Sequence, residues 1–166
     1  MLFSHVLSTT LAFAAFVVLF QERRGPPRLA AVGLAGLLAG LAVTAEFPVA
    51  LVGAIVGLYA IARRPVLARL GAYAVGAVVG VLPALLFNLW AFGNPLMFSY
   101  ANVVGDQEAN KRGLFGVSAP DFRTLVELLF SPIGLLVLTP VVVAGAVGLV
   151  LVYLRGHRFE AVVAGA

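Results

Sequence analysis

The chain has 166 residues, of which 62% are hydrophobic and only 11% are charged, whereas average soluble domains are about 45–50% apolar and about 25% charged. A soluble domain of this size could not hide so much apolar surface, so the composition excludes an ordinary soluble fold and favours a membrane protein. The formal net charge of +4 does not indicate nucleic-acid binding because the arginines flank apolar runs, and the lack of cysteine excludes disulfides and thiolate metal sites within this chain.

The first predicted elements are one spanning helix and one helical hairpin. Residues 2–20 are long and apolar enough to span a bilayer, which takes about 20 residues, and neither a basic leader nor a cleavage site marks them as a signal peptide. A second apolar stretch, 29–62, is interrupted by Glu46-Phe47-Pro48. Because one helix of that length would measure about 50 Å and proline does not continue a helix smoothly, we predict two helices at 29–45 and 48–62.

Two more spanning helices are predicted at 70–92 and 132–154, joined by a polar loop over 93–131. Inside the loop, apolar residues recur at helical spacing after a Ser-Ala-Pro-Asp helix start; they are Phe122, Leu125, Val126 and Leu129. This pattern predicts an amphipathic helix at the membrane surface. The expected fold class is therefore all-α: a multi-pass transmembrane helical bundle of about five spanning helices plus an exterior amphipathic interfacial helix, in a single transmembrane domain over 1–166.

The basic residues predict how the chain is oriented. Eight arginines would lie on one side of the membrane and three basic residues on the other; the eight are Arg23, Arg24, Arg28, Arg63, Arg64, Arg69, Arg155 and Arg158, and the three are Lys111, Arg112 and Arg123. The positive-inside rule then predicts a plasma (inner) membrane protein with an exterior N-terminus and a cytoplasmic C-terminus. A first helix in this orientation is hard to insert without a signal sequence, so we expect the chain to be part of a longer protein.

Three pairs of glycines, each spaced four residues apart, predict close helix packing. They are Gly36 with Gly40, Gly53 with Gly57, and Gly76 with Gly80. Such faces of small residues let helix backbones approach each other in lipid.

The most informative candidate site residue is Glu46, at the tip of the predicted hairpin. An acid in an otherwise apolar hairpin costs free energy unless it reaches water or a partner. It could act as a general base, accept a hydrogen bond from a substrate hydroxyl or ligate a divalent metal; alternatively, it caps the next helix or lies among lipid headgroups. No ligand spacing in the sequence supports a metal, so no cofactor is expected.

The other candidate binding residues lie on the same predicted side. His5 could bind a phosphate or be an ordinary interfacial residue, and Asn88 could hydrogen-bond across helices or line a cavity. The polar loop could bind an anionic or sugar-bearing ligand, or simply be solvated. Its candidate residues are Tyr100, Asn102, Lys111 and Arg112.

Several short stretches, taken in order, are similar to a known family. They are Phe3-Ser4-His5, residues 40–48 (GLAVTAEFP), residues 87–95 (FNLWAFGNP) followed by Tyr100, residues 113–117 (GLFGV) with Pro120, and Leu129-Phe130-Ser131-Pro132 with Gly134-Leu135. Together they resemble the C-terminal half of bacterial GT-C membrane glycosyltransferases, the group that includes protein mannosyltransferase-like and aminoarabinose transferase-like enzymes. Where that family often has an arginine between the Ser-Pro and Gly-Leu pairs, this chain has Ile133.

The resemblance implies transfer of a sugar from a polyprenyl-phosphate carrier on the exterior face. The family's catalytic acid lies in an early outer loop that no stretch of this chain matches, so the catalytic residues are unknown. The chain would then supply the lipid-carrier and acceptor-binding half, with His5, Glu46 and residues 102–112 lining the site. The implied partners are the lipid bilayer, a polyprenyl-phosphate sugar, and either the upstream half of the same polypeptide or a partner membrane subunit.

The competing hypothesis is a non-enzymatic multi-pass membrane module, such as an assembly subunit or a transporter piece. Transporters often contain internal repeats and helices broken at the membrane midplane. Here the break at Glu46 is expected near the membrane edge, and no repeat is evident, which disfavours transport.

Overall fold

The computed structural model describes residues 2–97, 122–131, 139 and 141–165, and within these ranges the chain is all-α. Seven α-helices and one short 3-10 helix occur in the described part. The chain divides into two compact units, one formed by Met1–Pro95 with Phe159–Ala166 and the other by Leu96–Arg158. The predicted fold class is therefore confirmed as far as all-α, and each unit is described separately below.

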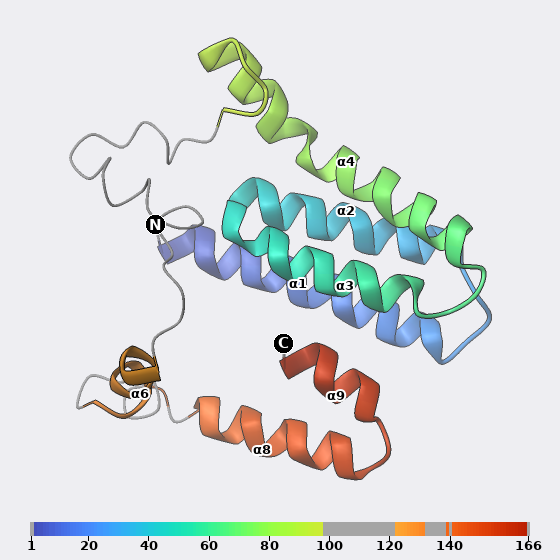
Figure 1. The fold of residues 1–166 in the computed structure, drawn as a ribbon. Coiled ribbons are helices and arrows are strands. Elements are labelled where there is room, and N and C mark those ends of the chain that lie inside the picture. Colours follow the sequence, from blue (N-terminus) through green and yellow to red (C-terminus); the bar gives the residue numbers. More distant parts are fainter. Residues whose placement is uncertain (1, 98–121, 132–138, 140, 166) are drawn as a thin grey trace. The chain divides into compact units, whose positions relative to one another are not determined.

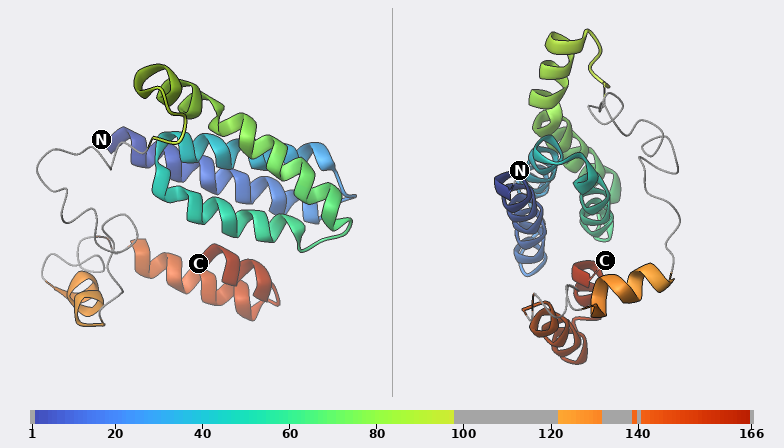
Figure 2. Two further views of the ribbon diagram at one scale, coloured as in Figure 1. Left: turned by 45° about the horizontal axis from the view of Figure 1, so that its top comes forward. Right: turned by 90° about the vertical axis from the view of Figure 1, so that its left-hand side faces the viewer.

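The first unit is built around four antiparallel helices in chain order (Figures 1 and 2). They are α1 (Leu2–Arg23), α2 (Leu29–Ala45), α3 (Ala50–Ile61) and α4 (Val66–Phe92), with the 3-10 helix η1 (Phe47–Val49) between α2 and α3. The short helix α9 (Arg158–Gly165), which the sequence analysis did not predict, adds its Phe159 ring to this unit, stacked 5.4 Å from the ring of Tyr59.

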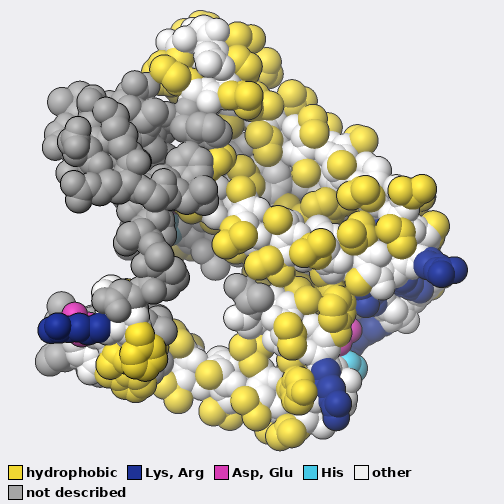
Figure 3. All heavy atoms as spheres, in the orientation of Figure 1, with side chains coloured by type: hydrophobic (Ala, Val, Ile, Leu, Met, Phe, Trp, Pro, Cys, Tyr) yellow, Lys and Arg dark blue, Asp and Glu magenta, His cyan; other side chains and the backbone are white. Residues whose placement is uncertain are grey.

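Two helices in the described residues are long and apolar enough to cross a membrane. They are α1, over Phe3–Arg23, and α4, over Val66–Phe92, and only 22% and 11% of their apolar windows are buried. Hydrophobic side chains accordingly cover the visible faces of this unit, as Figure 3 shows. The apolar helices α2, α3 with η1, and α8 of the second unit are shorter than a full span. Five spanning helices therefore stay a prediction.

The helix bounds agree with those predicted from the sequence for one helix and differ from them for three. Helix α2 has the predicted bounds, 29–45. Helix α1 continues three residues beyond the predicted end, and α4 begins at Val66 instead of residue 70, because Pro65 serves as its N-cap residue. The predicted 48–62 helix is η1 followed by α3, since Pro48 favours a tight turn before the regular helix.

The α2–α4 contact is close because glycine lies on both helices. A Cβ at Gly36 or Gly40 would overlap the backbone of Tyr73 or Ala77, and one at Gly76 or Gly80 would overlap the backbone of α2. Two of the three predicted glycine pairs thus form a single interface in which helix backbones touch directly.

The third glycine pair lies on α3 and packs more loosely. A Cβ at Gly53 would make an ordinary contact of 3.8 Å with Ala39, whereas one at Gly57 would lie 3.0 Å from the Tyr73 ring. The Tyr73 hydroxyl also donates a 2.6 Å hydrogen bond to the carbonyl oxygen of Gly53. This pair makes room for a tyrosine side chain and not for a neighbouring backbone.

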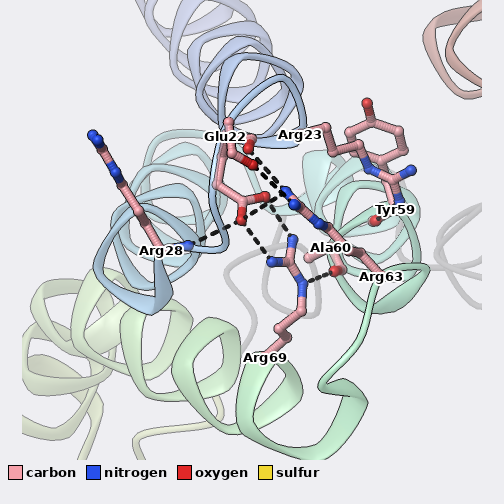
Figure 4. A network of polar contacts seen from close by, with 8 residues as sticks. Glu22, Arg23, Arg28, Tyr59, Ala60, Arg63 and Arg69 are labelled. Carbon is pink, nitrogen blue, oxygen red and sulfur yellow. Dashed lines mark hydrogen bonds and ion pairs between the residues drawn. The ribbon is translucent and has the colours of Figure 1, made fainter.

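A buried ion pair joins α1 to α4 at one end of this unit. Arg69 donates to both carboxylate oxygens of Glu22, at 2.8 and 2.9 Å, and its Nε donates to the carbonyl oxygen of Ala60 at 2.6 Å (Figure 4). The Arg69 and Glu22 side chains are 0% and 1% exposed. Since each nitrogen of the Arg69 guanidinium and both carboxylate oxygens of Glu22 have a partner, the burial of the pair costs far less than that of an isolated charge.

Two further arginines strengthen the same network. Arg63 donates to the Glu22 backbone carbonyl at 2.9 Å and lies 3.4 Å from its carboxylate. Arg23 donates to the carbonyl oxygen of Tyr59 at 2.8 Å and stacks over the Tyr59 ring, 4.1 Å from its centroid. The sequence analysis predicted only that these arginines flank apolar runs. In the structure they also bond one helix end to another.

We call this end of the first unit the arginine-rich end. It contains six arginines, which are Arg23, Arg24, Arg28, Arg63, Arg64 and Arg69, and they come from the α1–α2 and α3–α4 connections and the adjoining helix turns. Blue side chains at this end are visible in Figure 3. The beginning of α1 and the tip of the α2–α3 hairpin form the opposite end.

The second unit contains α6 (Phe122–Phe130) and α8 (Val141–Leu154). Helix α6 confirms the predicted amphipathic helix, and Arg123 pairs with Glu127 one turn later at 3.0 Å. The cap proposed at Ser118–Asp121 lies outside the described residues. Helix α8 covers the second half of the predicted 132–154 helix, and residues 132–138 also lie outside the described part.

Candidate functional site

The candidate site lies at the tip of the α2–α3 hairpin, where Glu46 ends α2. Its backbone is extended, with φ −151° and ψ 108°, and its N–H still donates to the carbonyl oxygen of Ala42. Its own carbonyl oxygen accepts from Val49 at 3.1 Å, which closes the turn. Just before it, the Thr44 hydroxyl donates to the carbonyl oxygen of Gly80 at 2.9 Å and holds the tip against α4.

The carboxylate of Glu46 contacts two polar side chains from the first turn of α1. The Ser4 hydroxyl donates to Oε1 at 2.8 Å, and Nδ1 of His5 lies 2.9 Å from the same oxygen. These residues are 42 and 41 positions apart from Glu46 in sequence, and they meet because α1 and α2 are antiparallel. The structure therefore brings together His5 and Glu46, two of the residues predicted to bind a ligand.

The side chains of Glu46 and His5 differ in exposure, and this difference limits what each of them can do. The side chain of Glu46 is 16% exposed, whereas that of His5 is 67% exposed. An Nδ1–H that donates to a carboxylate leaves Nε2 of neutral imidazole as a hydrogen-bond acceptor, while imidazolium presents a second donor there. Glu46 thus suits orientation of the imidazole, and His5 is the group more open to contact by a ligand.

The alternative role of Glu46 as a cap of the next helix is seen in its position but not in a side-chain hydrogen bond. Its side chain makes no capping hydrogen bond to the helix that follows, although Glu46 is the N-cap residue of η1. The carboxylate turns instead toward α1, where the Ser4 hydroxyl and the imidazole of His5 supply stronger partners than the few N–H groups of a three-residue 3-10 turn.

Within the described residues, Asn88 bonds to the turn after its own helix and not, as one hypothesis suggested, across helices. Its Nδ2 donates to the carbonyl oxygen of Pro95 at 3.3 Å. Gly93 ends α4 with a left-handed φ of 68°, so the chain folds back on the last helical turn and brings Pro95 within reach of Asn88. The other four candidate residues, which are Tyr100, Asn102, Lys111 and Arg112, lie outside the described residues.

Sequence reasoning missed Ser4 as a member of this site and missed the Glu22–Arg69 pair at the opposite end. A signal for each was present. Ser4 precedes His5 in the first turn of an apolar helix. Arg69 lies in an apolar run, and Glu22 is the only acid of the two arginine-bearing connections and their adjoining turns. A lone cation within an apolar run and a lone acid among arginines together suggest a pair.

The described residues contain no group of three or more His, Cys, Asp or Glu side chains that could hold a metal ion. Comparison of the chain with family models, with curated proteins and with solved structures finds no match.

Proposed function

We propose that this chain is a multi-pass membrane protein with its arginine-rich end in the cytoplasm. The small buried fraction of α1 and α4 supports this placement, because a core helix of a soluble protein would be mostly covered. The charge distribution supports the orientation, since the first unit carries six arginines at one end and a single histidine and acid at the other. About five spanning helices would complete the bundle.

Single introduced cysteines test this orientation, because the chain contains no cysteine of its own. Gln107→Cys should react with a membrane-impermeant thiol reagent added to intact cells, and Arg64→Cys should react only after the membrane is made permeable. Arg64 is exposed in the structure, so protection in intact cells would reflect the membrane and not burial. The reverse labelling pattern would overturn the orientation and move the candidate site to the other side.

Within that framework, we propose that the chain supplies the lipid-carrier and acceptor-binding half of a GT-C-like membrane glycosyltransferase. The observation that carries this proposal is the contact of Ser4 and His5 with Glu46. Ser4 and His5 belong to one stretch that resembles the family, and Glu46 belongs to the next. Two stretches that resemble one family are thus in contact at the end where a polyprenyl phosphate would bind.

The geometry suggests a role for each side chain. The exposed imidazole of His5 would contact the carrier phosphate or an acceptor hydroxyl, and the mostly buried Glu46 would hold the ring in place. Ser4 would fix the position of the Glu46 carboxylate. The acid that catalyses transfer would come from the upstream half of the polypeptide or from a partner membrane subunit.

Sugar transfer from a labelled polyprenyl-phosphate sugar tests the proposal. Membranes containing this chain joined to its upstream sequence should be active, and Glu46→Gln should reduce the rate roughly 10–100-fold, because a charged hydrogen-bond partner contributes about 1.5–3 kcal/mol. Glu160→Gln makes the same chemical change in α9 and should leave the rate unchanged. An unchanged rate in Glu46→Gln, or no transfer by a folded joined chain, would favour the non-enzymatic membrane module.

A further inference from the structure

We propose that the arginine-rich end binds an anionic phospholipid, with its headgroup between α1 and α2 and one acyl chain in the groove between α2 and α4. This inference rests on the proposed membrane placement, but not on glycosyl transfer. Three observations support it, namely an excess of positive charge, a pocket lined by two arginines that pair with no carboxylate of the described residues, and an apolar groove that shares Leu34 with that pocket.

The positive charge at this end exceeds what the protein itself neutralises. Glu22 is the only carboxylate of the α1–α2 and α3–α4 connections and their adjoining turns, and it is already bound by Arg69 and Arg63. Glu160 of α9 lies near Tyr59 at the same end, so the six arginines there face two carboxylates. No carboxylate of the described residues pairs with Arg24 or Arg28. The guanidinium of Arg24 stacks over the ring of Phe20, 4.3 Å from its centroid, a contact made by the face of the guanidinium and not by its N–H donors.

The backbone of Arg28 belongs to the Glu22 network, whereas the residue also lines the pocket described next. Its backbone N–H donates to Glu22 at 3.1 Å, so the base of the residue is fixed, while its side chain points away from the Glu22 network in Figure 4. A fixed backbone with an outward guanidinium is well suited to binding an anion, because little of the protein has to be reorganised.

These two arginines line a pocket of about 450 Å³ between α1 and α2. Glu22 also lines this pocket, with its carboxylate already bound by Arg69 and Arg63. Gln21 adds an amide, and the apolar part of the lining includes Val18, Ala31 and Leu34. A phosphate diester could therefore be contacted by two guanidinium groups and an amide, with the glycerol region against the apolar part of the lining.

Leu34 also lines a second cavity, an apolar groove of about 550 Å³ between α2 and α4. Gly71 leaves room in this groove, because a Cβ there would meet no atom within 4 Å, while Gly33 and Gly76 lie where the two helices touch. The rest of the lining is Leu37, Ala72, Val75 and Val79. A soluble anion would fill only the pocket. An amphiphile with an acidic head and a hydrocarbon tail fills both the pocket and the groove, so the structure favours a phospholipid.

The test uses the purified full-length chain in neutral detergent and measures lipid binding by native mass spectrometry. Phosphatidylglycerol should bind more tightly than phosphatidylcholine, and millimolar inorganic phosphate should not displace it. The Arg24→Gln/Arg28→Gln double variant should weaken phosphatidylglycerol binding about 30-fold, because each arginine near a lipid surface contributes about fivefold. Arg64→Gln is the control, since Arg64 belongs to the same end but does not line the pocket.

A second pair of variants tests the groove. Gly71→Leu should also weaken binding, because a Cβ at Gly71 meets no atom within 4 Å and a leucine there extends into the groove without disturbing the helix contact. Ala74→Leu adds a similar side chain to the same helix outside the groove and should have no effect. Unchanged binding in the double arginine variant or in Gly71→Leu, or displacement by phosphate, would overturn the proposal. Because all of these residues lie away from Glu46 and His5, loss of sugar transfer alone would leave it intact.

Discussion

Replacement of Arg69 by methionine is expected to destabilise the first unit by about 3 kcal/mol or more. Removal of one partner of a buried ion pair leaves the other charge uncompensated, which typically costs about 3–5 kcal/mol. Here Arg63 still lies 3.4 Å from Glu22 and offsets part of that cost, so we expect a value near the lower limit. The free energy of unfolding in mixed micelles, followed by helical circular dichroism as the fraction of denaturing detergent rises, measures this change.

Two further variants distinguish the effect of losing the ion pair from the effect of losing one positive charge. Arg64→Met removes an exposed arginine five residues earlier and should change the free energy of unfolding by less than about 0.5 kcal/mol. Adding Glu22→Gln to Arg69→Met should recover part of the stability, because no buried charge is then left unpaired. If Arg69→Met is no more destabilising than Arg64→Met, the bidentate pair does not hold α1 to α4.

The second large effect is expected at the glycine interface between α2 and α4. A Cβ at Gly76 would overlap the carbonyl oxygen of Gly33 and lie 2.8 Å from the backbone nitrogen of Leu37. Because these are backbone atoms that no rotamer change can move, Gly76→Ala must push the helices apart and should cost about 1–3 kcal/mol. The same unfolding measurement in micelles tests this expectation.

Gly71 provides a matched control on the same helix. A Cβ there would meet no atom within 4 Å, and alanine favours a helix over glycine by about 1 kcal/mol in water. Gly71→Ala should therefore leave the stability unchanged or raise it slightly. Equal destabilisation by Gly71→Ala and Gly76→Ala would mean that helix backbones do not touch at this interface.

The sequence predicted the helices of the first unit well because their ends carry strong local signals. Helix α2 is bounded by Arg28 on one side and by Glu46-Phe47-Pro48 on the other, and its ends agree with the prediction to the residue. The end of α1 was less clear, since Gln21, Glu22 and Arg23 are polar and yet helical. Helix length near charged residues depends on tertiary contacts, which a local pattern does not contain.

The candidate site was predictable in part. Alternating helix directions placed His5 and Glu46 on one side, but nothing local indicated that α1 would begin within hydrogen-bonding distance of the α2–α3 turn. The lone acid among arginines hints at an ion pair, but the sequence does not show which arginine is the partner of Glu22 or that the pair is buried. Helix α9 was missed because its eight residues, with Arg158 and Glu160 among them, are too few and too polar for a clear periodic pattern.

The Glu22–Arg69 pair also imposes an order on synthesis. The two residues are 47 positions apart, and α4, which carries Arg69, is the last of the four helices to be made. At a translation rate of about 5–20 residues per second, Glu22 waits roughly 2–9 s for its partner. During that interval the three-helix intermediate must keep its carboxylate in contact with water or headgroups. Final closure of the arginine-rich end is therefore a late event, completed only when the fourth helix arrives.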